Sequence, residues 1–194
     1  MLEQLAKENG LSIKTECICL ANYGLEDHMN DGLVAAELAA RQYQFVIFQQ
    51  GPSSQAYGRE SLFTYGQQLA VLALAHQATP AYLMVWPSKA YYQTFEGVIK
   101  NHTDAAKANG TLLIPLGLIW QKLNQEHPEF ELYGSDGFHP SPLGSFLEAV
   151  IILKKIAPET DFNTLKTASV ANLNIEQEAL SSFLRLVSDY LIEQ

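Results

Sequence analysis

The sequence predicts an α/β fold in which helices cover both faces of a parallel β-sheet. Short, almost wholly apolar segments at 43–49, 81–86 and 111–115 alternate with longer stretches of helical periodicity. Such alternation implies right-handed crossovers between parallel strands that are buried on both faces. A length of 194 residues fits one domain, 1–194, and 47% hydrophobic and 17% charged residues are typical of a globular protein.

Four strands are expected in this sheet. Residues 11–20 alternate between polar and apolar side chains, a pattern that predicts a strand. The other three are 43–49, which contains the continuous apolar run from Phe45 to Phe48, then 81–86, and finally 111–115.

Helical periodicity marks the segments between and around these strands. Gly10 and Gly110 end two of the predicted helices, and Thr79-Pro80 ends another, because these residues interrupt helical backbone. In chain order the predicted helices are 2–9, 31–41, 59–78, 89–109, about 116–125, 143–156 and about 175–192. The stretch 126–142 predicts a loop, and 157–174 is expected to be mostly irregular.

The last predicted helix, 175–192, carries apolar side chains on one face. Their helical spacing predicts that the helix packs on the body of the domain, and a partner interface is the alternative. These residues are Ala179, Phe183, Leu186, Val187 and Tyr190. This helix, or an exposed edge of the sheet, is also a candidate contact for a homo-oligomer.

The charge balance excludes two classes of partner. The net charge is −9, from 12 Lys and Arg against 21 Asp and Glu. A nonspecific binder of nucleic acid or of an anionic membrane carries the opposite balance. No apolar run reaches the length of a membrane span. The opening residues have a helical pattern unlike a signal peptide, so the chain as it stands is expected to be cytoplasmic; a lost upstream segment could hold a secretion signal.

Two cysteines, Cys17 and Cys19, exclude a disulfide framework. Their spacing places both on one face of the predicted strand at 11–20, and it disfavours a bridge between them. Because cysteine is among the most buried residue types, we expect both to be packing residues.

Three polar loops follow elements of the predicted sheet. They span Asn22–Asn30, Gln49–Tyr57 and Asp136–Ser141. Ligands of such sheets bind beyond the carboxyl ends of the strands, so the topology predicts that the three loops meet at one rim.

The third loop contains Asp136 and His139 in a turn rich in Gly and Pro. An Asp that accepts a hydrogen bond from an imidazole fixes its tautomer and stabilises the imidazolium. The other ring nitrogen can then act as a general base on a hydroxyl. The alternative is a plain helix start in which Ser141 is the N-cap residue.

These segments resemble the SGNH (GDSL-like) hydrolases. Residues 136–145, Asp-Gly-Phe-His-Pro-Ser-Pro-Leu-Gly-Ser, resemble the family's final block, in which Asp-x-x-His serves the nucleophilic serine. Residues 21–28 resemble the second block, and 45–54, ending in Gln-Gln-Gly-Pro-Ser-Ser, resemble the third. The resemblance covers residue 1 to about 156. It implies a three-layer, flavodoxin-like sandwich of about five parallel strands and ester hydrolysis through an acyl-enzyme, without metal or organic cofactor.

The family's first block, a strand followed by Gly-x-Ser-x-Thr, is missing from this sequence. The opening residues resemble the helix that comes after that block, and no Gly-x-Ser-x-Gly or Gly-Asp-Ser-Leu pattern occurs. The absent strand would be central, between 11–20 and 43–49. Three explanations stay open: the protein is longer, the nucleophile is lost, or another segment fills the gap.

The resemblance also implies donors for the oxyanion. Gly24 corresponds to the second-block residue whose backbone N–H donates to the oxyanion. Ser53 or Gln50 lies near the sequence position of the third-block donor. Ser53 is a poor candidate nucleophile, since nothing predicts the strained turn that exposes one. Trp86, which leaves a strand, is the best candidate to line a cleft.

Two functions therefore remain. The first is a serine-type ester hydrolase acting on an acyl or acetyl ester of a small molecule or carbohydrate, with Asp136 and His139 present and the serine upstream. The second is a non-catalytic module that binds a carbohydrate or acyl ligand. A metal site at His28 is a weaker alternative, because carboxylates around it usually form a solvated turn.

Overall fold

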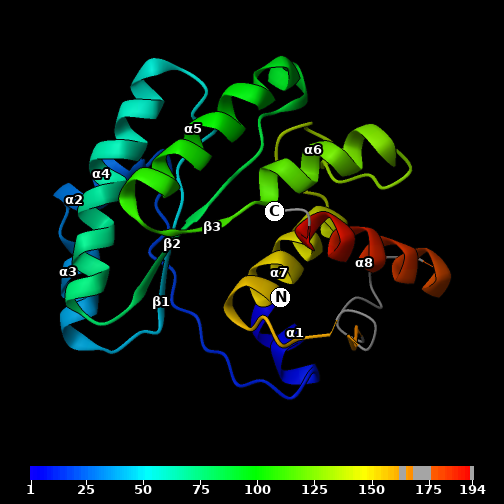
Figure 1. The fold of residues 1–194 in the computed structure, drawn as a ribbon, viewed down its shortest axis with the longest axis horizontal. Coiled ribbons are helices and arrows are strands. Elements are labelled where there is room, and N and C mark those ends of the chain that lie inside the picture. Colours follow the sequence, from blue (N-terminus) through cyan, green and yellow to red (C-terminus); the bar gives the residue numbers. More distant parts are fainter. Residues whose placement is uncertain (162–164, 168–175, 193–194) are drawn as a thin grey trace. The chain divides into compact units, whose positions relative to one another are not determined.

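The computed structural model describes residues 1–161, 165–167 and 176–192 (Figure 1). The chain divides into two compact units. Unit 1 comprises Met1–Glu16 and Ile119–Gln194, and unit 2 comprises Cys17–Leu118. Part of the predicted irregular stretch 157–174 and residue 175, the first of the predicted last helix, lie outside the described residues.

Unit 2 contains a parallel sheet of three strands. Their order is β1 (Phe45–Phe48), β2 (Thr79–Leu83), β3 (Leu112–Ile114), and Ile47 pairs with Ala81 and Leu83 with Ile114. Pro80 lies inside the central strand, but β3 begins to pair with β2 only at Ala81, so the missing N–H costs no ladder bond. The predicted α/β class with a parallel sheet is confirmed.

Helices α4 (Ala56–Ala75) and α5 (Phe95–Asn109) lie side by side on one face of this sheet (Figure 1). The 3-10 helix η1 (Lys89–Thr94) leads into α5, and α5 ends at Gly110, whose φ of +62° is the left-handed conformation that terminates helices. The short helices α2 (Leu25–Asn30) and α3 (Leu33–Ala40) precede β1, and α2 packs on α4.

The core of unit 2 is centred on Tyr82 of β2. Its ring makes an edge contact with Phe48, with ring centroids 4.5 Å apart. Its hydroxyl donates to the carbonyl oxygen of Leu62 at 2.5 Å, and burial raises its pKa to about 12. Gly66 makes this packing possible, because a Cβ there would lie 1.6 Å from the Tyr82 Oη.

Unit 1 is helical in its described residues. It contains α1 (Leu2–Glu8), most of α6 (Leu116–Glu126), α7 (Pro142–Ile156) and α8 (Gln177–Ile192). Helix α7 is largely buried and packs against α1. Phe183, Val187 and Tyr190 of α8 are buried, and Phe183 contacts Phe130 with ring centroids 5.1 Å apart. The apolar face of the last helix thus packs within its own unit.

The predicted strand at 11–20 is not formed, which corrects the sequence-based expectation. Residues 11–20 have no secondary structure, and most of them are exposed. In the sheet of the described residues, β1 is an edge strand. Residues 11–20 therefore do not pair with it as the predicted strand would. The predicted loop 22–30 also contains a helix, α2.

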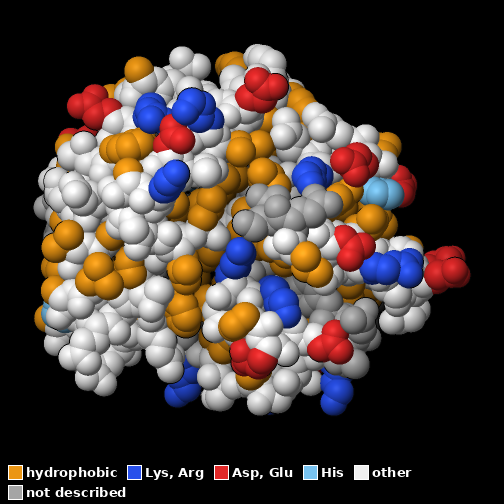
Figure 2. Space-filling model, in the orientation of Figure 1, with side chains coloured by type: hydrophobic (Ala, Val, Ile, Leu, Met, Phe, Trp, Pro, Cys, Tyr) orange, Lys and Arg blue, Asp and Glu red, His pale blue; other side chains and the backbone are white. Residues whose placement is uncertain are grey.

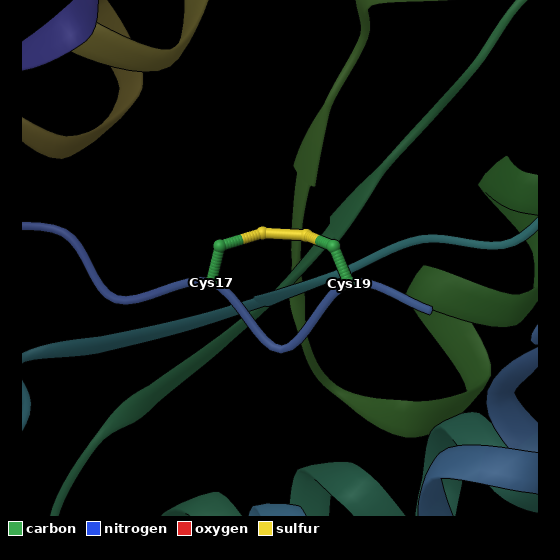
Figure 3. The surroundings of a disulfide bond; sticks show 2 residues. All are labelled: Cys17 and Cys19. Carbon is green, nitrogen blue, oxygen red and sulfur yellow. A yellow bond between two sulfur atoms is a disulfide. The ribbon is translucent and has the colours of Figure 1, made fainter. Parts of the chain in front are cut away.

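The expectation for the two cysteines was also wrong. Cys17 and Cys19 are exposed and joined by a disulfide bond (Figure 3). Because the segment does not enter the sheet, it has no buried face on which thiols could pack.

On the face drawn in Figure 2, Lys and Arg are interspersed with Asp and Glu. No helix in the described part of the chain has the length and apolarity needed to cross a bilayer.

Candidate active site

Asp136 and His139 form a hydrogen-bonded pair in unit 1. The Nδ1 atom of His139 lies 2.5 Å from Oδ2 of Asp136. The imidazole is 73% exposed and the carboxylate 50%. No other described residue bonds to the Nε2 atom of His139, so this nitrogen faces solvent with its lone pair available.

The backbone of the turn holds the pair in place. Oδ1 of Asp136 accepts from the backbone N–H groups of Phe138 and His139, each at 2.9 Å. Gly137 has a φ of +67°, a left-handed conformation that glycine adopts at little cost. The Gly134 N–H donates to the His139 carbonyl at 2.8 Å and closes the turn.

The hydrogen bonds to Asp136 lower its pKa to about 2, with the His139 imidazole as the largest cause and the Phe138 N–H next. The carboxylate therefore stays ionised at neutral pH. An ionised carboxylate at Nδ1 keeps the proton on that nitrogen, which leaves Nε2 as the base.

The turn is joined directly to the buried helix α7. Ser141 is the N-cap: its hydroxyl accepts from the Gly144 N–H at 3.0 Å and donates to the Glu131 carbonyl at 2.6 Å. Gly144 allows close packing, since a Cβ there would lie 2.3 Å from the Leu132 carbonyl oxygen. The capping role that the sequence suggested for Ser141 and the Asp136–His139 pair therefore occur together.

In unit 2, Gln50 follows β1 and is almost fully buried, with 8% exposure. Its amide nitrogen donates to the Ser53 hydroxyl at 2.6 Å and to the Gly58 carbonyl at 3.1 Å. Its amide oxygen accepts from the Ser61 hydroxyl at 2.7 Å and from the Leu25 N–H at 3.4 Å. Both donors of this side chain are thus engaged.

Ser53 is equally enclosed, with 5% exposure. Its hydroxyl donates to the Gly51 carbonyl at 2.9 Å, and its own carbonyl accepts from the Asn101 amide of α5 at 2.8 Å. Arg59 donates to the Asn101 amide oxygen at 2.9 Å and to Asp104 at 2.7 Å. The Ser53 side chain is therefore part of a polar network that fixes the loop.

Two glycines let the helices close on this loop. A Cβ at Gly58 of α4 would lie 2.8 Å from the Ser53 Cβ, and one at Gly97 of α5 would lie 3.1 Å from the Ser54 Cβ. A Cβ at Gly58 would force a shift and one at Gly97 would be tight, so both helices approach the loop closely.

Gly24 lies beside this network, so the loops that contain Gly24 and Gln50 are in contact. The Gln50 amide oxygen lies 3.6 Å from the position of a Cβ at Gly24. The Gly24 N–H donates to the exposed carboxylate of Asp27 at 2.8 Å. Trp86, three residues beyond β2, is 9% exposed and thus mostly buried.

Sequence reasoning missed the network as a whole. The five buried polar or charged side chains among the described residues are Gln50, Ser53, Ser61, Asn101 and His102, and the first four belong to it. A second feature that it missed is Glu26, which accepts from Tyr57 at 3.0 Å and from Tyr65 at 2.6 Å and raises the pKa of both phenols.

The metal alternative gains no support in the described residues. No group of three or more His, Cys, Asp and Glu side chains is arranged there to hold an ion. The ring of His28 instead contacts the ring of Tyr23 in a tilted arrangement, with ring centroids 5.1 Å apart.

Comparison with known proteins gives the fold. No model of a protein family matches the chain, and no curated protein matches it. A protein from Slackia heliotrinireducens, described as "a putative SGNH hydrolase", aligns with a TM-score of 0.68 and 22% identity over 80% of this chain and 91% of its own. A DUF4886 family protein from Bacteroides uniformis aligns with a TM-score of 0.75 and 14% identity over 99% of this chain and 88% of its own. The chain therefore has an α/β fold of the SGNH-hydrolase type.

Proposed function

We propose that the protein is a serine-type ester hydrolase in which Asp136 and His139 supply the acid–base part of the catalytic triad. The observation that carries this proposal is the 2.5 Å contact between His139 Nδ1 and Asp136 Oδ2, with Nε2 left without a partner among the described residues. An imidazole oriented in this way can accept a proton from an alcohol.

The roles follow from this arrangement. His139 Nε2 takes the proton of a serine hydroxyl as its oxygen attacks the ester carbonyl carbon, and the carbonyl π electrons move to oxygen. The imidazolium then protonates the leaving alcohol, and an acyl-enzyme remains. A water molecule, deprotonated by the same imidazole, releases the acid. Asp136 stabilises the imidazolium in both steps.

We place the nucleophilic serine in a segment that precedes residue 1. Two observations support this: the sequence contains no Gly-x-Ser-x-Gly pattern, and β1 is an edge strand in the sheet of the described residues. An edge strand offers unpaired backbone groups to a further strand.

Among the proposed oxyanion donors, Gly24 is favoured over Ser53 and Gln50. The latter two can donate to a substrate only by breaking bonds inside a buried network, which leaves polar groups unsatisfied. The Gly24 N–H is held by the exposed Asp27 carboxylate, which can turn into solvent at small cost.

The proposed substrate is an acyl or acetyl ester of a small molecule or carbohydrate, and Trp86 is the proposed apolar wall. Neither role needs a metal or an organic cofactor. The family that the sequence resembles acts on many esters, which supports this class of substrate but does not identify one member of it.

The test compares two proteins on p-nitrophenyl acetate: the 194-residue chain and the product of the complete natural reading frame. We expect hydrolysis by a protein that carries an upstream Gly-x-Ser-x-Thr segment and little or none by the 194 residues alone. Hydrolysis by the 194-residue chain that Ser53→Ala abolishes would overturn the placement of the serine.

A second candidate function is a non-catalytic module that binds a carbohydrate or acyl ligand. It is favoured by one observation, the engagement of all three proposed oxyanion donors with partners inside the protein. A complete reading frame without a serine block, combined with ligand binding that His139→Ala does not weaken, would support this module.

A further inference from the structure

Phe138 presents a large apolar ring in the turn that carries the proposed base. It lies between Asp136 and His139 in the sequence and is 45% exposed. Single exposed apolar side chains are common on protein surfaces, so exposure alone gives this residue no role. Its place beside the imidazole of His139 is the feature that does.

The turn holds the Phe138 ring against the imidazole. The two rings make an edge contact, with centroids 5.0 Å apart and planes at 65°. The backbone N–H of Phe138 donates to Oδ1 of Asp136 at 2.9 Å, and Oδ2 of the same carboxylate lies against His139 Nδ1. One carboxylate therefore fixes both the aromatic residue and the base beside it.

The proposed reaction brings the alcohol half of the ester to this place. In the acylation step the Nε2 atom of His139 gives its proton to the oxygen of the leaving alcohol, which requires an approach to about 2.6–3.2 Å. The carbon attached to that oxygen then lies next to the imidazole. Because the imidazole is 73% exposed, there is room beside it for the rest of the alcohol.

The exposed ring of Phe138 suits a partner with a flat apolar face. Aromatic side chains favour stacked or edge contacts with other rings, and covering this ring with a ligand removes apolar surface from water. Ligand sites accordingly combine aromatic walls with a few polar groups that orient the ligand. Trp86, the proposed apolar wall, is 9% exposed and offers far less surface than Phe138.

We propose that Phe138 is a specificity-determining residue that contacts the leaving alcohol, and that this alcohol is a ring with an apolar face, as in a pyranose sugar or an aryl alcohol. The proposal rests on the proposed ester hydrolysis. Phe138 takes no part in the proton transfer, which stays with His139. Because the alcohol departs before water attacks the acyl-enzyme, the contact acts on acylation and not on release of the acid.

The test measures kcat/KM of the product of the complete natural reading frame on three acetate esters. Two have a ring in the alcohol, p-nitrophenyl acetate and glucose pentaacetate, and one, trifluoroethyl acetate, has an activated alcohol without a ring. This parameter contains only the steps up to loss of the alcohol. Phe138→Ala should lower kcat/KM for the ring esters, relative to the ringless ester, by about three- to tenfold.

Two further variants separate a ring contact from a general disturbance. Phe138→Tyr keeps the aromatic ring and should keep the preference for the ring esters. Leu74→Ala removes another exposed apolar side chain, near the end of α4 and before β2 begins, and should leave all three rates unchanged. A loss on only one ring ester would support the contact and identify the alcohol as aryl or sugar.

Two results would overturn the proposal. An equal loss on all three esters, or no loss, in Phe138→Ala would show that the ring does not contact the alcohol, and His139-dependent hydrolysis would then still support the proposed function. If no ester were hydrolysed in a manner that depends on His139, the proposed function and this inference would both be wrong.

Discussion

The imidazole of His139 and the carboxylate of Asp136, three residues earlier in one turn, share a hydrogen bond of 2.5 Å while the turn's backbone N–H groups bind the other carboxylate oxygen. The pair therefore depends on local backbone geometry rather than on distant packing. The pKa of Asp136 is the property that depends most directly on the hydrogen bond between the two side chains.

Removal of the imidazole should raise the pKa of Asp136. In His139→Ala the largest cause of the lowered pKa is gone, and the bond from the Phe138 N–H remains, so the value should rise from about 2 toward, but not fully to, the ordinary 3.8. Carboxyl carbon shifts followed by NMR titration measure it. His127→Ala, which removes the partner of Glu129, is the matched control and should leave Asp136 unchanged.

The same pair should make the protein sensitive to strong acid. A carboxylate whose pKa is lower in the folded than in the unfolded state stabilises the fold above the unfolded pKa, and this contribution is lost as the pH falls from about 4 to about 2. The free energy of unfolding, measured with denaturant in that pH range, should depend less on pH in Asp136→Asn than in the wild type. Equal slopes would argue that the bond is absent in solution.

Gln50→Ala should lower the free energy of unfolding by about 1–3 kcal/mol, because the Ser53 and Ser61 side chains lose a buried partner. Gln55→Ala, at an exposed position five residues later, should change it by less than about 0.5 kcal/mol. Urea denaturation measures the free energy of unfolding of both variants. A similar decrease in the two would contradict the buried network.

His102 should make the fold less stable below neutral pH. Its Nδ1 bonds to the Val98 carbonyl at 2.8 Å, its Nε2 has no partner, and burial lowers its pKa. As the pH falls below the unfolded value of about 6.5, the unfolded chain binds a proton that the folded chain resists, so the free energy of unfolding falls.

The measurement for His102 is the slope of unfolding free energy against pH between 7 and 5. In the wild type it should exceed the slope of His102→Leu by up to about 1.4 kcal/mol per pH unit. A variant with the wild-type slope would show that His102 titrates normally in the folded state.

Gly66→Ala should destabilise the protein although it lies within α4, where alanine normally gains about 1 kcal/mol over glycine. The added methyl group meets the Tyr82 hydroxyl, and overpacking of this kind costs about 1–3 kcal/mol. Gly51→Ala, with nothing within 4 Å, is the control and should be near neutral. Thermal unfolding compares them, and a more stable Gly66→Ala would contradict the packing of Tyr82.

Local sequence signals predicted the parts of the structure that depend on local chemistry. The continuous apolar run Phe45–Phe48 became the strand β1, as predicted, with Phe48 buried and the other three residues partly buried. Asp136 and His139 could be paired from sequence because three residues in a glycine turn bring them within reach.

Features that depend on distant partners could not be predicted. Alternation at 11–20 defines the two faces of a strand but not whether a neighbouring strand exists, and the structure provides none among the described residues. The buried network joins Ser53 to Asn101 over 48 positions of sequence, and no pattern in a single sequence links them. Helix α2 was missed because its six residues are too few to show a period.

The rate of p-nitrophenyl acetate hydrolysis by the product of the complete natural reading frame, wild type against His139→Ala, tests the central claim most directly. A triad base predicts a loss of at least about 10³-fold in kcat, with Asp136→Asn also strongly impaired and His127→Ala unaffected. An active wild type whose rate survives His139→Ala, or a complete reading frame that shows no hydrolysis at all, would contradict the assignment of His139 as the catalytic base.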